Sequence, residues 1–349
     1  MNIDAILNER FTSLELTLAI NKRQNEYGLI NSMGVFNEVG IKDRQVKIET
    51  RSQTLQIIPT SEIGTPAPAA DDPDVRDVRI LPTFRHAKMH KLLAEELQGV
   101  RMFGSDDENE YVDIKVLEML DKIQREHRQT KEFLRWGALK GDVYDADGSR
   151  LLFNTYDVMG ETQKTIEYDL DDADAVDAIQ DGNDELLDYM EDEALGEIVT
   201  GVILLCSPGF IQKMQHNKAF REAYKYHAEA AGEVNPNRQS LRRPFEFKDA
   251  MFLRHRGSCT FKKRDGTIVK HVFIPDGEAI AVPLGTNETF ETYFGPGEFM
   301  DTVNTIGQEL YVKPEQMKLD MGIELHSFSY ALNLVSKPRL VVKVKVKAV

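Results

Sequence analysis

The chain contains little cysteine, no long hydrophobic run and no leader signature. Its two cysteines, Cys206 and Cys259, allow at most one disulfide, and both stand in apolar sequence that is typical of small buried thiols. No apolar run reaches the ~18 residues that a membrane helix requires. The first residues, MNIDAILNER, lack the basic start and apolar core of a secretion signal. We therefore expect a protein that is made and kept in the cytoplasm and has no membrane partner.

Positive charge is absent from one long stretch. No Lys or Arg occurs in residues 165–212, whereas fourteen Asp and Glu residues lie within 167–197. This cluster accounts for nearly all of the net charge of −15. Because a groove that grips DNA needs clustered basic side chains, we do not expect such a groove here. The acidic stretch predicts a helix with an apolar stripe of Leu186, Leu187, Met190 and Leu195.

Signatures of nucleotide and calcium binding are also missing. The chain has neither a Walker-type glycine loop nor a dinucleotide fingerprint, and Gly295-Pro-Gly297 is a tight turn. Residues 143–148 imitate part of a calcium loop, but its first and twelfth positions are Val143 and Asn154, which are not carboxylates. A hairpin turn explains this segment better.

Other reactive side chains form only weak candidate sites. His86 and His90 stand four apart on an expected helix, which suits a metal ion, yet no third ligand is visible. The acidic residues within 171–192 are better explained as a solvated helix face than as a cation site. A third group, which matches no known thiol-protease spacing, is Cys259, His271 and Asp276. We expect no catalytic, cofactor-binding or metal-binding residue.

What is present indicates a folded protein with more than one lobe. A chain of 349 residues is long enough for two or three hydrophobic cores. Its hydrophobic content of 41% and charged content of 29% are those of a soluble folded protein and not of a disordered one. Residues 1–44 carry two short helical patterns and are too few to fold alone, so they predict an N-terminal arm.

The most informative pattern runs through residues 110–160. Apolar residues with helical spacing begin and end a long helix, whereas residues 124–132 are all polar. A helix that is polar on every side commonly bridges other bodies. We therefore expect its ends to be anchored on separate cores and its middle to lie across a neighbour. Gly137 and Gly141 lie near the helix end, where a left-handed cap favours glycine, and Asp147-Gly148 predicts the turn of a following hairpin.

An extended loop is predicted before this helix. Residues 46–58 and 75–80 have the alternation of strands, and the segment between them is rich in Pro, Ala, Thr and Asp. Because a long loop without its own structure is usually functional, they predict a two-stranded loop with a soft tip. The alternative is a disordered linker. The loop has no lysine between Lys47 and Lys88, and residues 85–98 predict a short helix.

The C-terminal half is predicted to be a mixed α/β lobe. A buried strand at 197–206 is followed by Ser207-Pro208, which opens a helix to about Glu229 as N-cap and first helical residue. The alternation of strand and helix continues to Ile274. Residues 340–347 alternate apolar and charged side chains, which predicts a half-buried strand whose lysines suit a sheet edge.

Four segments, in order along the chain, carry a family resemblance. They are LTLAINKRQNEYGLINSMGVF (16–36), LAEELQGVRMFG (93–104), QTKEFLRWGALKGDVYDADG (129–148) and FETYFGPGEFMDTVNTIGQELYVKP (290–314). The serine-rich, apolar HSFSYALNLVSKPRLVV then follows. Together these segments resemble the lambda-like major capsid protein family of tailed bacteriophages. None of the motifs is chemical, so the resemblance is one of fold.

The resemblance implies an α+β fold that is shared with the capsid floor of herpesviruses. Its parts would be an N-terminal arm (1–44), an extended β-hairpin loop (45–90), a peripheral domain with a long spine helix (91–165 plus 311–349) and an α/β axial domain (166–310). The axial domain would meet its copies at the centre of each hexamer or pentamer.

The resemblance also implies a structural function without enzymatic activity. Many copies would self-assemble into an icosahedral shell that encloses double-stranded DNA without sequence-specific binding. Portal and scaffold proteins, and a decoration protein, would be further partners. The chain would be part of the virion and would assemble in the cytoplasm of the host bacterium. One alternative is an encapsulin-like, non-viral compartment subunit, and a remote one is a metal-dependent hydrolase that uses His86, His90 and the acidic cluster.

Some charged residues are candidate contacts between subunits. These are Arg76, Arg79, Glu126, Arg128, Lys131 and Glu132. The alternative for the two arginines is that they are solvated strand charges, because exposed ion pairs contribute little. Some related shells form a covalent bond from a loop lysine to a neighbour, so the lysine-free loop predicts a shell without such cross-links. The acidic segment 167–197 would face the interior and keep packaged DNA from sticking.

Overall fold

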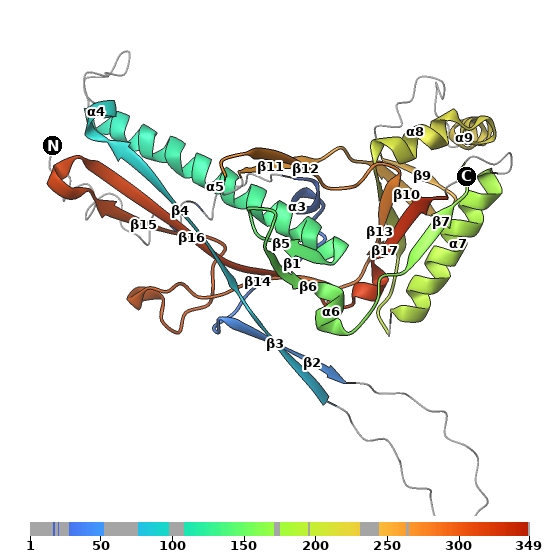
Figure 1. The fold of residues 1–349 in the computed structure, drawn as a ribbon, viewed down its shortest axis with the longest axis horizontal. Helices are drawn as coiled ribbons and strands as arrows, with labels where there is room; N and C mark the ends of the chain where they lie inside the picture. The colour runs from blue at the N-terminus through green and yellow to red at the C-terminus, as the bar shows by residue number, and fades with distance from the viewer. Residues whose placement is uncertain are drawn as a thin grey trace, which may run out of the picture.

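The computed structural model describes residues 17, 20, 28–51, 76–97, 108–170, 175–194, 196–230, 244–262 and 265–347. Figure 1 shows an elongated molecule with two lobes and a narrow hairpin that projects away from them. One lobe is built on a five-stranded sheet and the other on a six-stranded sheet. The helical patterns expected in the N-terminal arm before residue 28 lie almost entirely outside the described residues, as does Leu195.

The predicted long helix is confirmed as α5 (Glu108–Lys140). Its first half packs on the five-stranded sheet through residues such as Leu120, which is fully buried. Its second half enters another core, where Trp136 and Leu139 are also fully buried. The helix is thus anchored on two cores, as its apolar ends indicate. It ends at Gly141, whose φ of 97° gives the left-handed conformation that favours glycine.

The five-stranded sheet lies against α5. Its long strand β16 pairs along one edge with β4, and along the other edge with β15 and then β14, which in turn pairs with β1. The short helical turn η3 lies between β14 and β15, and the turn η4 lies between β15 and β16. The bounds are β1 (Asn37–Gly40), β4 (Phe84–Leu93), β14 (Phe290–Phe294), η3 (Met300–Thr302), β15 (Tyr311–Gln316), η4 (Lys318–Asp320) and β16 (Gly322–Val335).

The short helix predicted at 85–98 is wrong. Strand β4 occupies most of this segment, and only α4 (Ala94–Leu97) is helical. The strand pairs with β16 over its full length, from Phe84 opposite Ala331 to Leu93 opposite Gly322. Pairing with a long strand outweighs the local helix propensity of this Lys- and Leu-rich segment, since tertiary context commonly overrides propensity.

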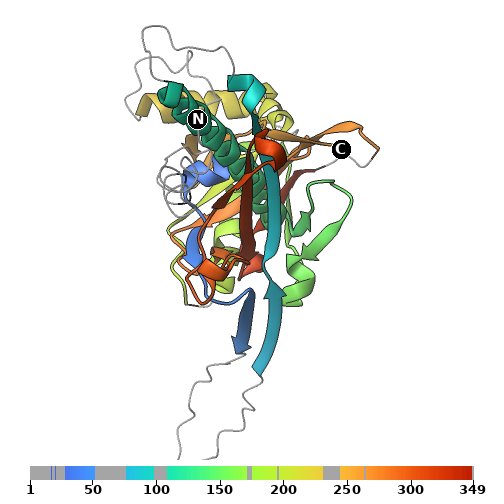
Figure 2. The same cartoon turned by 90° about the vertical axis from the view of Figure 1, so that its left-hand side faces the viewer.

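The predicted extended loop is confirmed at its base. Strands β2 (Gln45–Arg51) and β3 (Arg76–Pro82) form an antiparallel pair that leads directly into β4. Figure 2 shows this hairpin projecting from one end of the body. Residues 52–75, which include the expected tip, lie outside the described residues. Before the hairpin, the short helix α3 (Leu29–Met33) lies beside α5.

The hairpin predicted after α5 is also confirmed. Strands β5 (Asp142–Tyr144) and β6 (Leu151–Asn154) pair in antiparallel fashion. Gly148 occupies the turn with a φ of 65°. Helix α6 (Thr155–Met159) follows and is capped by the side chain of Asn154.

The six-stranded sheet has the strand order β7-β17-β13-β8-β10-β9. Helices α7, α8 and α9 pack on one face, and the opposite face shares a core with the end of α5. The predicted buried strand is β8, and Ser207 and Pro208 are the N-cap and first residue of α8 as predicted. The bounds are β7 (Thr165–Tyr168), α7 (Ala175–Glu193), β8 (Gly201–Cys206), α8 (Pro208–His216), α9 (Lys218–Ala230), β9 (Phe245–Phe247), β10 (Ala250–Arg254), β13 (Glu278–Leu284), η5 (Pro338–Leu340) and β17 (Val342–Val346).

Two details of this lobe differ from the sequence predictions. The single helix expected after Ser207 breaks at Asn217, whose side chain accepts a hydrogen bond from Phe220 N at 3.1 Å and so starts α9. The C-terminal strand β17 is half-buried as predicted, but it is not an edge strand, because β13 and β7 pair with its two sides. Its lysines are accommodated by Glu278, which forms ion pairs with Lys343 and Lys345.

A separate hairpin connects the two lobes. Strands β11 (Ser258–Lys262) and β12 (Ile268–Val272) pair only with each other within the described chain. They cross α5, where the Phe261 and Phe133 rings lie 6.3 Å apart. Strand pairing also crosses the expected domain ranges, since β17 belongs to the six-stranded sheet and β14 to the five-stranded one. The four-part division itself stays a prediction.

Candidate functional site: the polar middle of the spine helix and the exposed hairpins

Part of the polar middle of α5 faces its own chain, although Arg125 is exposed. Gln124 is 3% exposed, Lys131 9% and Glu132 1%, and Arg135 just beyond the stretch is 2% exposed. These side chains are therefore enclosed by their own chain, and whether the stretch also lies across a neighbour stays a prediction. The sequence pattern could not show that an N-terminal segment and the five-stranded sheet of the same chain would enclose them.

Glu132 fastens the N-terminal segment to the helix. Its carboxylate accepts hydrogen bonds from Ile30 N at 3.0 Å and Asn31 N at 2.9 Å, so that it caps the start of α3. It also accepts a hydrogen bond from Trp136 Nε1 at 2.9 Å. Gly28, whose φ is 100°, leaves no room for a side chain beside this carboxylate. A buried charge with three donors is the satisfied arrangement that burial demands.

Lys131 and Arg135 share two carboxylates next to this cap. Lys131 Nζ lies 2.8 Å from Glu38 and 2.5 Å from Glu309, and Arg135 Nη2 lies 2.7 Å from Glu38. Burial raises the pKa of Glu38, but the charges and hydrogen bonds of Lys131 and Arg135 outweigh it and lower that pKa overall. Arg128 Nε lies 3.7 Å from Glu309 at the margin of this group. The network joins α5 to β1 and to the segment before β15.

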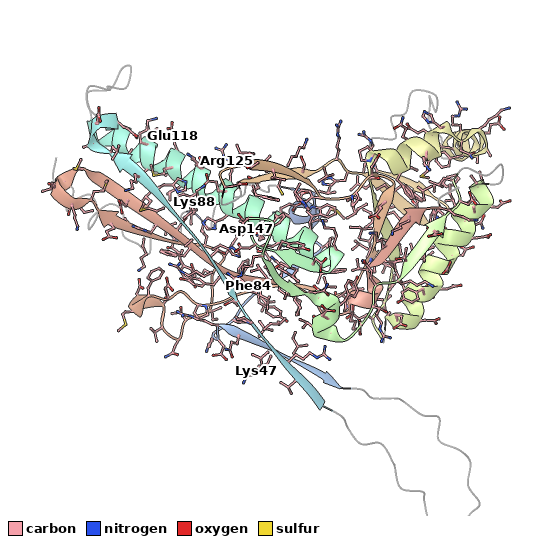
Figure 3. All side chains as sticks on the ribbon, in the orientation of Figure 1. Lys47, Phe84, Lys88, Glu118, Arg125 and Asp147 are labelled. Carbon is pink, nitrogen blue, oxygen red and sulfur yellow. The ribbon has the colours of Figure 1, made fainter. Side chains whose placement is uncertain are left out.

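A second group lies where α5 crosses β4. Glu126 forms an ion pair with Lys88 at 2.9 Å, and its other carboxylate oxygen lies 2.9 Å from His90 Nε2. Figure 3 labels Lys88 on β4. His127 Nε2 lies 2.9 Å from Ser327 Oγ of β16. Burial lowers the pKa of His127 to about 4, with a further contribution from the neighbouring His86, so this side chain is neutral near pH 7.

The histidine pair considered as a metal site does not form one. His86 and His90 lie on a strand and not on a helix, so a spacing of four residues separates them by about 13 Å along the chain. Helical spacing would have brought them together on one face. The two side chains instead line the contact between β4 and α5, and burial lowers the pKa of each.

The other weak candidates have local structural roles. Asp276 accepts a hydrogen bond from Gly209 N at 2.8 Å at the start of α8. Cys259 pairs opposite His271 in the β11–β12 hairpin, and burial raises the pKa of its thiol. Asp147 accepts hydrogen bonds from Ser149 N and Arg150 N and so closes the hairpin turn. The acidic residues of α7 line its solvent-exposed face, as expected for the described part of 171–192.

The two candidate arginines lie at the base of the extended loop. Arg76 is the first residue of β3 and stands opposite Arg51. The guanidinium of Arg79 lies against Gly160 at the end of α6. Glu126, Arg128, Lys131 and Glu132 all have partners within the chain, as described above. Whether any of the six also contacts another subunit stays a prediction.

Exposed apolar side chains gather on three projecting segments. These side chains were not singled out in the sequence analysis. On β3, Val78 is 49% and Ile80 53% exposed, and both share a face with Lys47 of β2. The second segment is the loop around η3, where Met300, Val303 and Ile306 are exposed. The third is the turn around η4, where Leu319 and Met321 are exposed. Such groups commonly mark surfaces for protein association.

The described chain has no helix that is both long and apolar enough to cross a membrane. Its notable features are an enclosed polar network that fixes one long helix and apolar groups on projecting hairpins. Exposed apolar groups on projecting segments are typical of proteins that associate with other chains. Comparison with known proteins identifies the family.

Solved structures share this fold. One is the putative capsid protein of a prophage of E. coli CFT073, with a TM-score of 0.54 and 14% identity over 96% of this chain and 99% of that one. Another is a chain from the mature capsid of bacteriophage PhiM1, with a TM-score of 0.52 and 11% identity over 90% of this chain and 85% of that one. The predicted fold of tailed-phage capsid proteins is thus confirmed.

Sequence relatives establish the family. The family model of phage major capsid protein E matches residues 12–346. The major capsid protein of Pseudomonas phage KPP10 is 27% identical, over 97% of this chain and 98% of that protein. The major capsid protein of Salmonella phage Felix O1 is 28% identical, over 97% of each chain. The chain belongs to the phage major capsid protein E family, which confirms the resemblance inferred from its segments.

Proposed function

We propose that the chain assembles as hexamers and pentamers of an icosahedral phage head that encloses double-stranded DNA. Family membership makes the chain a structural subunit of a phage head shell and a component of the virion, and does not favour the encapsulin-like alternative. Self-assembly into a shell follows from the same membership. The symmetry, the enclosed DNA and the partners beyond the chain itself are the parts that we propose.

The observation that supports this assembly most directly is the projecting β2–β3 hairpin. It is a two-stranded sheet of its own, and Val78 and Ile80 are each about half exposed on one face. An isolated two-stranded hairpin is marginally stable in water. It gains stability when its apolar face lies on another subunit, so that assembly and ordering of the hairpin are coupled. Many such contacts, each weak, multiply in a closed symmetric shell.

We further propose portal, scaffold and decoration proteins as partners, and assembly in the cytoplasm of the host bacterium. A shell without covalent loop bonds gains from other reinforcement, which a decoration protein on its outer surface would provide. The six charged residues named above remain our candidates for contacts between subunits. Arg76 and Arg79 are the best placed of them, because they lie on the projecting hairpin.

The acidic face of α7 is proposed to point toward the packaged DNA. Asp177, Asp181, Asp184 and Asp188 are exposed on it and have no ion-pair partner among the described residues. Negative charge on the inner wall would repel DNA phosphates and keep the packaged DNA movable. A particle structure that places this face on the outer surface would contradict the proposal.

The test of the assembly proposal is electron microscopy of the purified full-length chain, with size-exclusion light scattering beside it. We expect closed shells or rings of five and six copies, formed by the chain alone or when the scaffold protein of the same phage is present. A chain that stays monomeric in both conditions would overturn the proposal. Assembly of DNA-free shells that package an enzyme cargo and lack a portal would favour the compartment alternative instead.

A further inference from the structure

We propose that Glu315, Glu324 and His326 form a binding site for one divalent transition-metal ion, of which Zn²⁺ is the best fit. The site lies on one face of the β15–β16 hairpin, close to its turn at η4. Each residue offers one ligand atom, and the three atoms lie within 4.8 Å of one another. The sequence analysis expected no metal site here, because it did not pair these two strands.

The strand register brings the three side chains together. Glu315 of β15 stands directly opposite Glu324 of β16. His326 lies two residues beyond Glu324, and side chains two apart on a strand point to the same face. The backbone of a paired hairpin therefore fixes all three positions. Only the outer parts of the side chains need to adjust when an ion binds, which limits the entropy lost on binding.

The distances suit a shared ion better than direct hydrogen bonds. His326 Nε2 lies 3.4 Å from Glu315 Oε2 and 3.3 Å from Glu324 Oε2. Charge-assisted N–H···O bonds are commonly about 2.7–2.9 Å long. Ligand atoms that surround a tetrahedral zinc ion at ~2.0–2.2 Å are about 3.3–3.5 Å apart, which follows from the tetrahedral angle. The two measured separations match that edge length.

The imidazole nitrogen that faces the carboxylates has no hydrogen-bond partner. His326 Nε2 is shielded from solvent and makes no hydrogen bond of acceptable geometry, although two carboxylates lie beside it. A buried polar atom without a partner costs free energy that a ligand can recover. This nitrogen therefore points to something that occupies the space between the three groups.

The charges around the site are incomplete without a cation. Glu315 and Glu324 carry like charges and face each other across two strands, which is destabilising. Lys91 of β4 forms an ion pair with Glu324 Oε1 at 3.0 Å. Oε2 of the same carboxylate stays directed at His326. Glu315 has no lysine or arginine partner among the described residues.

The donor set determines which ion the site prefers. One imidazole nitrogen with two carboxylate oxygens suits zinc and its transition-metal neighbours, whereas Mg²⁺ and Ca²⁺ prefer oxygen ligands alone. Three protein ligands would leave at least one position of the ion open to a further ligand such as water. A bound ion would hold β15 to β16 beside the exposed turn of the hairpin.

The competing explanation is that the three side chains lie together without a bound ion. It predicts no metal uptake beyond what scattered surface groups provide. Equilibrium dialysis of the metal-free, full-length chain against Zn²⁺ near neutral pH distinguishes the two explanations. We expect saturable uptake of one ion per chain, with Mg²⁺ unable to compete.

Variants locate the ion. His326→Ala and Glu315→Gln should each weaken Zn²⁺ binding by at least about tenfold, since even residues outside the ligand set change metal affinity about 10–100-fold. His216→Ala is the matched control, because this histidine is exposed at the end of α8, and it should bind Zn²⁺ as the wild type does. Glu315 is mostly exposed, so its substitution keeps the fold, and unchanged Trp136 fluorescence verifies that.

Cobalt gives an independent readout that does not depend on affinity. Co²⁺ in a tetrahedral site absorbs visible light strongly, and we expect this absorption in the wild type and in His216→Ala but not in His326→Ala. Uptake that is unchanged in both site variants, or equally reduced in His216→Ala, would overturn the proposal. The absence of saturable Zn²⁺ uptake by the wild type would do the same.

Discussion

The buried Glu132 carboxylate accepts a hydrogen bond from the indole of Trp136, one helical turn further along α5, at 2.9 Å. The same indole stacks with two other rings, His255 at 5.0 Å and Phe273 at 5.3 Å between ring centroids. The carboxylate meanwhile holds the start of α3. These two side chains thus connect the N-terminal segment, the spine helix and the residues that flank the β11–β12 hairpin.

Removal of this carboxylate should destabilise the subunit. Glu132→Ala leaves two backbone N–H groups and the Trp136 indole without a partner, each at a cost of about 1–3 kcal/mol. We expect the free energy of unfolding to fall by on the order of 3 kcal/mol, measured by chemical denaturation of the unassembled chain and followed by Trp136 fluorescence.

Glu132→Gln and Glu118→Ala are the controls for this measurement. The first keeps an acceptor oxygen and should cost less. The second removes an exposed carboxylate from the same helix (Figure 3), where its pair with Lys115 contributes little. Equal losses for Glu132→Ala and Glu118→Ala would show that the cap does not stabilise the fold.

The parts of the fold that local pattern determines were predictable from sequence. Helix α5, its Gly141 cap and the Asp147-Gly148 turn depend on residues close in the chain. Strand β4 was mistaken for a helix, and β17 for an edge strand, because each depends on partners that lie far away in the sequence. Long-range pairing leaves little trace in the pattern of a single segment.

The candidate site follows the same division. The polar middle of α5 was visible as nine polar residues, yet its role depends on Glu38 and Glu309, which lie far from it in the chain. The group of Glu315, Glu324 and His326 carries one local signal, a glutamate and a histidine two apart on a strand. Its third member appears only when the register of two strands is known.

Acid should weaken the contact between α5 and β4. The pKa of His127 is about 4 in the folded chain, below the value near 6.5 of an unfolded histidine. The unfolded state therefore binds more protons between these values, and stability that is complete above about pH 6.5 is lost as the pH falls toward 4. The loss from His127 is on the order of 3 kcal/mol, and His86 and His90 change stability in the same direction.

The groups that face His127 include Ser327, His86, His90, Lys88 and Glu126. His127→Gln removes the titrating group and keeps a polar side chain that reaches Ser327. Free energies of unfolding measured across this pH range should depend less steeply on pH in the variant than in the wild type. Parallel curves for the two proteins would refute the assignment of this effect to His127.

The apolar face of the extended hairpin should be needed for assembly and not for folding. Val78 and Ile80 are exposed on β3, so Val78→Asp with Ile80→Asp removes little from the core of the subunit. Because the same contact recurs throughout a shell, we expect the yield of closed particles to fall by more than about tenfold. Electron microscopy counts the particles, and Trp136 fluorescence verifies the fold.

Ile268→Asp is a comparison for that experiment, because Ile268 is an apolar strand residue that is 72% exposed on a different hairpin. We expect it to reduce particle yield less than the loop variant does. If the loop variant assembled as well as the wild type, the hairpin would not be the contact that drives assembly.

The mature shell should contain no covalent bonds from this loop. A bond from a side-chain amine needs a lysine nucleophile, and no lysine occurs between Lys47 and Lys88. Lys47 lies in β2 at the base of the hairpin, and Lys88 lies in β4. Lys88 already forms an ion pair with Glu126. Denaturing gels of mature particles should therefore show one band at the mass of the single chain. Particles treated with a chemical cross-linker supply the control. A ladder of covalent multimers in untreated particles that disappears in Lys47→Arg would show that a bond does form at the hairpin base.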